Sequence, residues 1–253
     1  MHIFLVNDDG IGTPGIMALA RAATARGHKV SMCAPASQQS AAGQRITLTD
    51  PIYVSPRSFE GYDITAYAIQ GTPTDCVRLG LLSLVKEPVD LLISGINDGY
   101  NSGTAVYYSG TFGAAREGAL HHLPAIAASI SYHATPTMLE HFAAFVIETA
   151  ESYRTLTLPA DAVLNINAPL REPEDLLPPV FAPMSTATYI DQYLCRESPR
   201  AGTYYWLDRG AHTEAFADGS DQDMLKKGHI TLTLMGHIAE HNAACAKLVL
   251  PQA

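Results

Sequence analysis

Oxygen-bearing side chains recur in this sequence directly after short apolar runs. They are Asp8 and Asp9 after the first run, Ser40 in the polar loop after the second, and Asn97 after the run at residues 89–93. Carboxylate, hydroxyl and amide oxygens are hard ligands, which suit Mg²⁺, Mn²⁺ or Ca²⁺ better than zinc. Taken singly, the two aspartates could form a tight turn and Ser40 a solvated loop hydroxyl. Their shared position after predicted strands favours a divalent-cation site.

A second polar group precedes a predicted helix at residues 112–121. Ser109, Gly110 and Thr111 lie at its start, and Asn101 lies in the Gly-rich loop before them. A helix start with free N–H groups, hydroxyls and a positive dipole end is suited to binding phosphate. The alternative is an ordinary helix cap, the commoner use of Ser and Thr at this position. These motifs contain no Lys or Arg, so a bound cation must supply most of the positive charge.

Together these residues predict hydrolysis of a phosphate ester. A metal ion would hold a phosphate oxygen and lower the pKa of a bound water. Either Asp8 or Asp9 would take the proton of that water or attack the phosphorus directly, and the sequence leaves this choice open. Ser109, Gly110 and Thr111 would stabilise charge on the phosphoryl oxygens, with Asn101 as a neutral donor.

The strands and helices that must position these residues are predicted to form an α/β fold. A strand at residues 3–6, a helix that starts at Thr13 and Pro14, and a strand at residues 30–34 have the spacing of a right-handed βαβ unit. Parallel strands end at one edge of a sheet, where ligands bind in such folds. We expect a Rossmann-like three-layer core with a mainly parallel sheet. Further strands are predicted at residues 64–69, 89–93, 125–130 and 162–166, helices at 73–84 and 136–153, and a strand or hairpin outside the main sheet at 46–54.

The sequence changes character near residue 170. Proline becomes frequent there, and the strand-like runs at residues 203–207 and 229–234 are aromatic or β-branched. We therefore expect a catalytic core at 1–170 and a β-rich extension with a C-terminal segment at 171–253, within the same domain. Unpaired strands present open edges. The extension is thus predicted to be an oligomerisation arm of a homodimer or homotetramer.

Composition and charge indicate which binding partners and which cellular location to expect. The chain has 253 residues and a net charge of −9, which argues against an electrostatic footprint for a nucleic-acid polymer. No apolar run approaches the roughly 20 residues of a membrane span, so no membrane partner is expected. The four cysteines are far apart and form no CxxC pair, and residues 1–6 lack a basic leader. A cytoplasmic location with reduced thiols is expected.

Two other classes of protein share parts of this pattern. A signalling receiver domain also has paired acids after its first strand, but it needs an Asp at the end of a middle strand and a Lys at the end of a later one. Here those ends are Ser94-Gly95-Ile96-Asn97 and Ser129-Ile130. A dinucleotide-binding module needs G-x-G-x-x-G after the first strand, and Gly10, Gly12 and Gly15 have the wrong order.

Longer ordered motifs run along the chain from residue 1 to about 235. They are Asn7-Asp8-Asp9-Gly10 with Pro14-Gly15-Ile16, Gly71-Thr72-Pro73-Thr74-Asp75-Cys76-Val77, Ser94-Gly95-Ile96-Asn97 with Asn101, Tyr108-Ser109-Gly110-Thr111 with Ala114-Ala115 and Glu117-Gly118, Pro124-Ala125-Ile126-Ala127, Asn165-Ile166-Asn167-Ala168-Pro169, and Ser220-Asp221 with Gly228. In these motifs the sequence resembles the SurE (survival protein E) nucleotidases. One departure concerns the loop after the second strand. The family usually has Ser-Gly there, whereas Ala41 follows Ser40 in this chain, which changes the expected loop geometry and substrate preference.

The resemblance implies a divalent-metal phosphatase with one Mn²⁺ or Mg²⁺ per subunit. Its substrates would be nucleoside 5′-monophosphates, often 3′-monophosphates too, and sometimes short polyphosphate. By motif position the metal ligands would be Asp8, Asp9, Ser40 and Asn97. The resemblance also implies that the C-terminal extension is exchanged between subunits.

Overall fold

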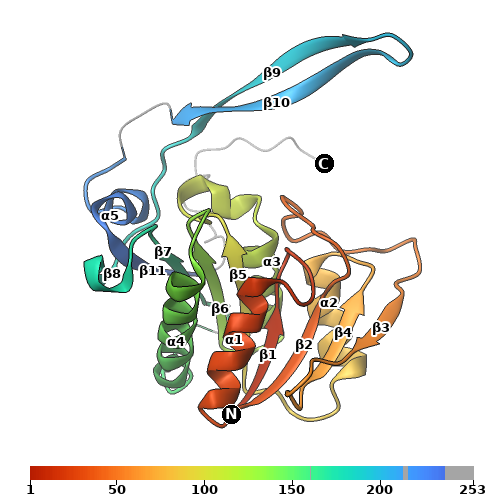
Figure 1. Ribbon diagram of the computed structural model, residues 1–253, viewed down its shortest axis with the longest axis vertical. Coiled ribbons are helices and arrows are strands. Elements are labelled where there is room, and N and C mark those ends of the chain that lie inside the picture. The colour runs from red at the N-terminus through yellow and green to blue at the C-terminus, as the bar shows by residue number, and fades with distance from the viewer. Residues whose placement is uncertain (160, 213–215, 237–253) are drawn as a thin grey trace, which may run out of the picture.

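The chain folds around a single large sheet, shown in Figure 1. The computed structural model describes residues 1–159, 161–212 and 216–236. The strands of the sheet are β1 (His2–Val6), β2 (Lys29–Pro35), β3 (Val54–Arg57), β4 (Thr65–Ile69), β5 (Leu91–Asp98), β6 (Ala125–Ile130), β7 (Val163–Ala168), β8 (Leu177–Phe181) and β11 (His229–Met235). They form a nine-stranded sheet in the order β3-β4-β2-β1-β5-β6-β7-β11-β8. Six neighbouring strands, in the order β4-β2-β1-β5-β6-β7, run parallel, so their carboxyl ends share one edge of the sheet.

Helices cover both faces of this sheet. The longer helical segments are α1 (Pro14–Ala25), α2 (Pro73–Leu79), α3 (Gly110–Leu120), α4 (Pro136–Tyr153) and α5 (Asp221–Lys227), with shorter turns at η1 (Gly80–Leu84), η2 (Gly103–Tyr107) and η3 (Pro173–Asp175). Residues of α1 and α4 share one apolar cluster on one face, and residues of α2 and α3 share another on the opposite face. The predicted α/β class with a Rossmann-like core is confirmed. Among the described helices, none is both long and apolar enough to cross a bilayer.

The prediction of a strand or hairpin at residues 46–54, outside the main sheet, is wrong both in its residue range and in its position. Only its last residue enters β3, and β3 pairs antiparallel with β4 at the edge of the main sheet. The preceding segment is held by a side chain instead of a strand, because Asp75 accepts hydrogen bonds from the backbone N and Oγ1 of Thr47 at 2.9 and 2.7 Å. Leu48 in this segment is 83% exposed, so the apolar alternation there does not mark a buried face.

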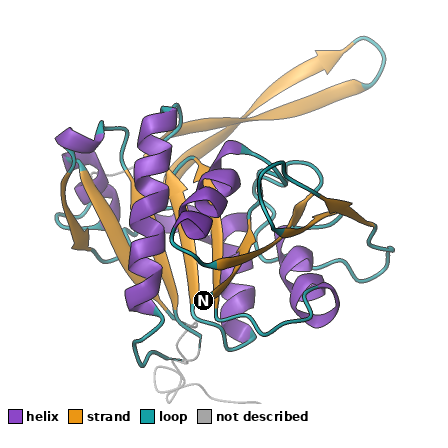
Figure 2. Cartoon of the chain, turned by 60° about the horizontal axis from the view of Figure 1, so that its bottom comes forward, coloured by secondary structure: helices purple, strands orange, loops and turns teal. Residues whose placement is uncertain are grey.

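The core continues past the expected boundary near residue 170. Strand β11 pairs antiparallel with β7, with Leu232 opposite Ile166, and β8 lies parallel to β11 at the sheet edge. The strand predicted at residues 229–234 therefore forms, but inside the core. What projects is narrower: β9 (Tyr189–Ser198) and β10 (Gly202–His212) form a two-stranded antiparallel hairpin that stands away from the body in Figures 1 and 2. The part of the expected extension at residues 237–253 lies outside the described residues.

Candidate active site

The predicted metal ligands after β1 lie beside the ends of two neighbouring strands. Strand β1 pairs with β2 on one side and β5 on the other. The backbone N of Gln39, in the loop after β2, donates to the backbone O of Asp8 at 2.7 Å. The backbone N of Asp98, the last residue of β5, donates to Asp9 Oδ2 at 3.3 Å. The sheet thus gathers the three polar strand ends that the sequence singled out.

The turn that carries the two aspartates is shaped by Asn7. This residue is fully buried, and its Nδ2 donates to Gly10 O at 3.0 Å and to Thr13 Oγ1 at 2.9 Å. The backbone N of Gly10 donates back to Asn7 Oδ1 at 3.1 Å. Thr13 precedes α1 as predicted, but its hydroxyl serves this turn by donating to Gly10 O instead of capping the helix. Sequence reasoning gave Asn7 no role, although a buried Asn before two acids is a signal for such a turn.

Asp8 is buried against the start of α3. Its side chain is only 5% exposed, and Thr111 Oγ1 donates a short hydrogen bond to its Oδ1. A Cβ atom on Gly110 would lie 3.0 Å from the Asp8 Cβ and 3.1 Å from Oδ2. A side chain at position 110 would crowd the Asp8 carboxylate, so glycine favours this close approach of the helix start. The hydroxyl that the sequence assigned to phosphate binding is therefore directed at Asp8.

Burial makes both aspartates harder to ionise. It raises the pKa of Asp8 to about 6, partly opposed by the Thr111 hydrogen bond and reinforced by the charge of Asp9. Burial also raises the pKa of Asp9, which is half-buried and faces the charge of Asp98, although the Asp98 amide and Gln38 hydrogen bonds oppose this rise. A cation between the two carboxylates would remove this cost.

The donor set fits a hard cation. Among the described residues, no ion pair joins Asp8 or Asp9 to a basic side chain. The same part of the chain contains no group of three or more His, Cys, Asp or Glu placed to hold a metal. A metal at the aspartate pair would therefore need neutral oxygen ligands, which is what Ser40 and Asn97 offer.

Ser40 lies in a loop that is tied to the site on both sides. The Gln39 amide binds Asp8, as described above, and the Gly43 amide donates to the backbone O of Tyr108 at 3.0 Å. Ala41 has a φ of 55°, in the left-handed region that favours glycine. The departure from the expected Ser-Gly sequence therefore falls at the residue whose backbone would accept glycine best.

Asn97 follows an irregular part of β5. The register with β6 shifts between Ser94 and Asn97, and the Gly95–Ile96 peptide bond is cis. Gly95 has a φ of 140°, and a Cβ there would lie 2.3 Å from the Ala128 backbone O, which requires glycine. Asn97 Nδ2 donates to Gly99 O at 2.7 Å. This bond orients the amide and leaves Oδ1 available as a ligand atom.

Asn101 is held by buried polar residues of β6 and β7. Its Nδ2 donates to Ser129 Oγ at 2.9 Å, and its backbone N donates to Asn167 Oδ1 at 2.9 Å. Its backbone O accepts from Nδ2 of Asn165 at 2.8 Å and of Asn167 at 3.2 Å. One Nδ2 hydrogen of Asn101 remains for the expected contact with phosphate. Sequence reasoning gave these three partners no role, although polar residues in apolar strands are the signal that could have identified them.

Ser109 caps α3. Its Oγ accepts from the Phe112 backbone N at 3.0 Å, so the ordinary capping role that the sequence left open is present. The cap does not remove the phosphate-binding features, because the first backbone N–H groups of a helix have no partner within it. The N-terminus of α3 thus lies directly beside the buried Asp8 carboxylate.

Comparisons with known proteins show the family to which the chain belongs. The family model described as Survival protein SurE matches residues 3–191. The chain belongs to the SurE family. It is 40% identical over 248 residues to a protein of Solidesulfovibrio magneticus named 5′-nucleotidase SurE, covering 98% of this chain and 96% of that one. A protein of the same name from Desulfovibrio desulfuricans is 40% identical over 240 residues, 92% of this chain and 91% of that one. The crystal structure of a SurE protein from Aquifex aeolicus superposes with a TM-score of 0.81 at 28% identity and covers 98% of both chains.

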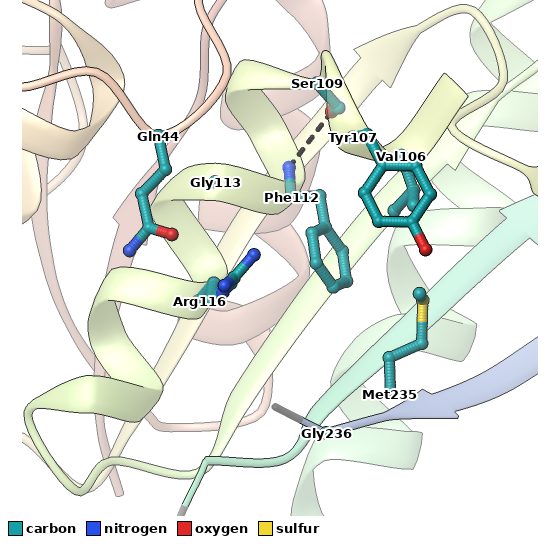
Figure 3. Close-up of a pocket in the computed structure, with 9 residues that line it drawn as sticks. All are labelled: Gln44, Val106, Tyr107, Ser109, Phe112, Gly113, Arg116, Met235 and Gly236. Atoms are coloured by element: carbon teal, nitrogen blue, oxygen red, sulfur yellow. Dashed lines mark hydrogen bonds between the residues drawn. The ribbon is translucent and has the colours of Figure 1, made fainter. Parts of the chain in front are cut away.

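Two cavities lie near the candidate site of this SurE chain, and the larger one is lined in part by Asp9. One, of about 110 Å³, lies beside the start of α3, and Figure 3 shows Arg116 and Gln44 on one side of it with Tyr107 and Met235 on the other. The Nε atom of Arg116 is buried there without a hydrogen-bond partner. A larger cavity of about 390 Å³ opens at Asp9. Its lining includes Asp9, Asp98, Gln38, Ile96, His133 and Leu139.

Proposed function

We propose that this SurE protein is a divalent-metal-dependent phosphatase that converts nucleoside 5′-monophosphates to nucleoside and phosphate. The observation that carries the proposal is the pair Asp8 and Asp9, which lacks a basic partner among the described residues and lies against the N-terminus of α3. A site for a cation therefore lies next to backbone N–H groups suited to an anion. The names of the SurE relatives from Solidesulfovibrio and Desulfovibrio support nucleotide hydrolysis.

One Mn²⁺ or Mg²⁺ per subunit would be held by Asp8, Asp9, Ser40 and Asn97. When bound, such an ion neutralises charge on a phosphate oxygen and lowers the pKa of a water ligand. These are carboxylate, hydroxyl and amide oxygens, which match the preference of both ions.

The chain's own residues divide the remaining work. Asp8 is fixed by the Thr111 hydroxyl and by the close approach of Gly110, so it serves as a rigid ligand. Asp9 is half-buried, and its contacts with Gln38 Nε2 and the Asp98 amide are long, at 3.4 and 3.3 Å. It therefore has more freedom to take a proton from water or to approach the phosphorus.

The phosphate group would lie at the start of α3. Backbone N–H groups of Gly110 and Thr111, the Ser109 hydroxyl and the second Nδ2 hydrogen of Asn101 would contact its oxygens. Such preorganised donors stabilise charge that develops in the transition state. The same site would accept 3′-monophosphates and short polyphosphate, because it would contact only the phosphate group.

The proposal includes a homodimer or homotetramer formed through the β9–β10 hairpin. Side chains on the hairpin are exposed, including Tyr193, Tyr205 and Trp206 at 67, 63 and 63%. A run of exposed aromatic residues on a projecting hairpin marks a contact surface. A nucleic-acid polymer and a membrane are not expected as partners, and a cytoplasmic location remains the prediction from sequence.

A phosphate-release assay tests the function. The purified protein is stripped of metal with EDTA and incubated with AMP, with and without added Mn²⁺ or Mg²⁺. We expect release of inorganic phosphate only with metal, and hydrolysis of p-nitrophenyl phosphate by the same preparation. Absence of phosphate release from a panel of 5′- and 3′-nucleotides with both ions would overturn the proposal. The panel also measures base preference.

A further inference from the structure

Asp221, the first residue of α5, is a buried carboxylate more than 200 residues from the aspartate pair in sequence. It is 1% exposed. Its Oδ2 accepts from the backbone N of Gly103 at 2.8 Å, and its Oδ1 accepts from the backbone N of Ser185 and of Gln222, each at 2.8 Å. Three separate places in the chain therefore meet at one side chain.

This arrangement is more than a helix cap. A buried carboxylate is costly unless donors surround it, and backbone N–H groups satisfy it well. Only one of the three donors, Gln222, belongs to α5 itself. Among the described residues, Asp221 forms no ion pair, so its charge is balanced by these amides. The other two donors lie in segments that α5 must hold in place.

The first of these segments is the loop that joins β5 to α3, residues 99–109, here called the active-site loop. It contains Asn101 and leads through η2 to Ser109. It also packs closely on α5, because a Cβ on Gly103 would lie 2.7 Å from the Gln222 side chain. The loop is thus fixed at Asn101 by the buried polar residues of β6 and β7, and at Gly103 by Asp221.

We infer that Asp221 is a positioning residue for the reaction. This inference rests on the proposed function, because it concerns the same site. Asp221 is placed to contact the Gly103 amide and not the substrate, and it acts by holding the active-site loop so that Asn101 and Ser109 face the phosphate. The same carboxylate binds the Ser185 amide, four residues before β9 begins. The base of the hairpin and the active-site loop therefore share one anchor.

The test compares Asp221→Asn with Asp223→Asn. Asn has the size of Asp, but its NH₂ group cannot accept from the Gly103 or Ser185 amide. Asp223 is a matched control in the same helix: its carboxylate accepts from the Gly219 amide at 2.8 Å and has no bond to the active-site loop. For each variant, kcat with AMP, Mn²⁺ affinity, thermal stability and amide hydrogen exchange of residues 99–109 are measured.

For Asp221→Asn we expect kcat to fall about tenfold or more, since a displacement of about 1 Å can cost 100-fold. Exchange in the active-site loop should rise, while Mn²⁺ affinity stays near that of the wild type because the metal ligands lie elsewhere. Asp223→Asn should keep kcat and loop protection. Equal kcat and equal loop exchange in the two variants would overturn the inference, as would a loss of stability without a change in the kcat of folded protein.

A second substitution covers the case in which Asp221→Asn does not fold. Asp221→Glu keeps the charge and the acceptor oxygens but displaces them by one methylene, so it should fold with raised exchange in the active-site loop and reduced kcat. Normal exchange and kcat in this variant would contradict the inference. A wild-type protein inactive on every nucleotide would overturn the proposed function instead, and the exchange measurement would still decide whether Asp221 holds the loop.

Discussion

The carboxyl edge of the sheet and the β9–β10 hairpin differ in how their side chains are satisfied. At the sheet edge, polar groups are buried and are met by partners from the same chain, as with Asp8 and Thr111 or Asn101 and Ser129. On the hairpin, aromatic side chains such as Tyr205 and Trp206 lie in solvent at 63% exposure. In the described part of the chain, the polar groups of the sheet edge find partners within the subunit, except that the charge of the two aspartates is not balanced. The aromatic side chains of the hairpin, in contrast, have no apolar surface of the described residues covering them.

This difference indicates what each region lacks. A cation would complete the aspartate pair, and a protein surface would complete the hairpin. The two regions meet through Asp221, which anchors both the active-site loop and the segment that enters β9. Changes at one region should therefore leave the other intact unless they disturb this anchor.

The largest effect is expected from Asp9→Asn. The substitution keeps the shape of the side chain but removes the charge that would bind the metal and accept a proton. We expect turnover of AMP to fall by several orders of magnitude and Mn²⁺ binding to weaken, as measured by phosphate release and calorimetry. The oligomeric state should not change. Near-normal turnover at saturating Mn²⁺ would show that Asp9 is not a ligand.

The next largest effect is expected on the oligomeric state, when the hairpin is shortened. Gln192 and Asp208 are paired across the hairpin, so residues 193–207 can be replaced by an Asn-Gly turn that closes the two strands. We expect the intact protein to be a dimer or tetramer by size-exclusion chromatography with light scattering, and the shortened protein to be smaller. Mn²⁺ binding should persist because β11 and α5 are retained.

A single substitution provides the control for this comparison. Trp206→Ser removes an exposed aromatic residue from the hairpin, and Leu48→Ser removes an 83% exposed apolar residue from the loop before β3. The first should weaken assembly and the second should not. If the intact protein is a monomer, the hairpin has another purpose and the contrast between the two regions does not hold.

Much of the sheet edge was predictable because its signals are local. Apolar runs followed by Asp8, Asp9 or Asn97 identify strand ends, and a parallel sheet must bring such ends together. The partners of these residues were not predictable from their own surroundings. Thr111 was expected to face phosphate but bonds to Asp8. Two of the three N–H groups on Asp221, those of Gly103 and Ser185, come from segments that only the folded chain brings to α5.

For the hairpin and its surroundings, the sequence indicated the strands but not where they pack. The aromatic run at residues 203–207 correctly indicated a strand, but residues 229–234 have a similar alternating pattern and lie in the core. Alternation reports that one face of a strand is covered, not what covers it. For β11 the cover is the subunit's own apolar core, which includes Ile230 and Leu232. The sequence therefore predicted the strands better than the boundary near residue 170.

The two hydroxyls at the start of α3 should respond differently, with a smaller effect than Asp9. Ser109→Ala removes a helix cap and a proposed phosphate contact, so turnover should fall by about one to two powers of ten while Mn²⁺ affinity is retained. Thr111→Val removes the hydrogen bond to Asp8, so it should weaken Mn²⁺ binding as well. Parallel kinetics and Mn²⁺ titrations distinguish the two. Identical Mn²⁺ affinities would refute the role of Thr111 as a support for Asp8.

A smaller effect concerns stability without metal. The pKa of Asp8 rises from 3.8 to about 6 on folding, so the folded protein binds this proton more tightly than the unfolded chain. Ionised Asp8 therefore costs stability above pH 6, and the cost disappears as pH falls from about 6 towards 4. Asp8→Asn should raise the unfolding free energy of the metal-free protein at pH 7.5 by roughly 1–3 kcal/mol, with a smaller gain at pH 4.5. Denaturant unfolding at both values measures this, and an equal gain at both would contradict it.

The smallest effect is expected in the loop that carries Ser40. Ala41 has a φ of 55°, which costs a residue with a Cβ about 1 kcal/mol relative to glycine. Ala41→Gly should therefore stabilise the metal-free protein slightly, offset in part by the extra freedom of glycine in the unfolded chain. Ala42→Gly is the matched control, because Ala42 has no positive φ and the substitution should only destabilise. Because the loop is tied at Gln39 and Gly43, metal affinity should change little in either variant. Thermal unfolding with and without Mn²⁺ tests this, and equal destabilisation by both substitutions would show that the backbone at Ala41 is not strained.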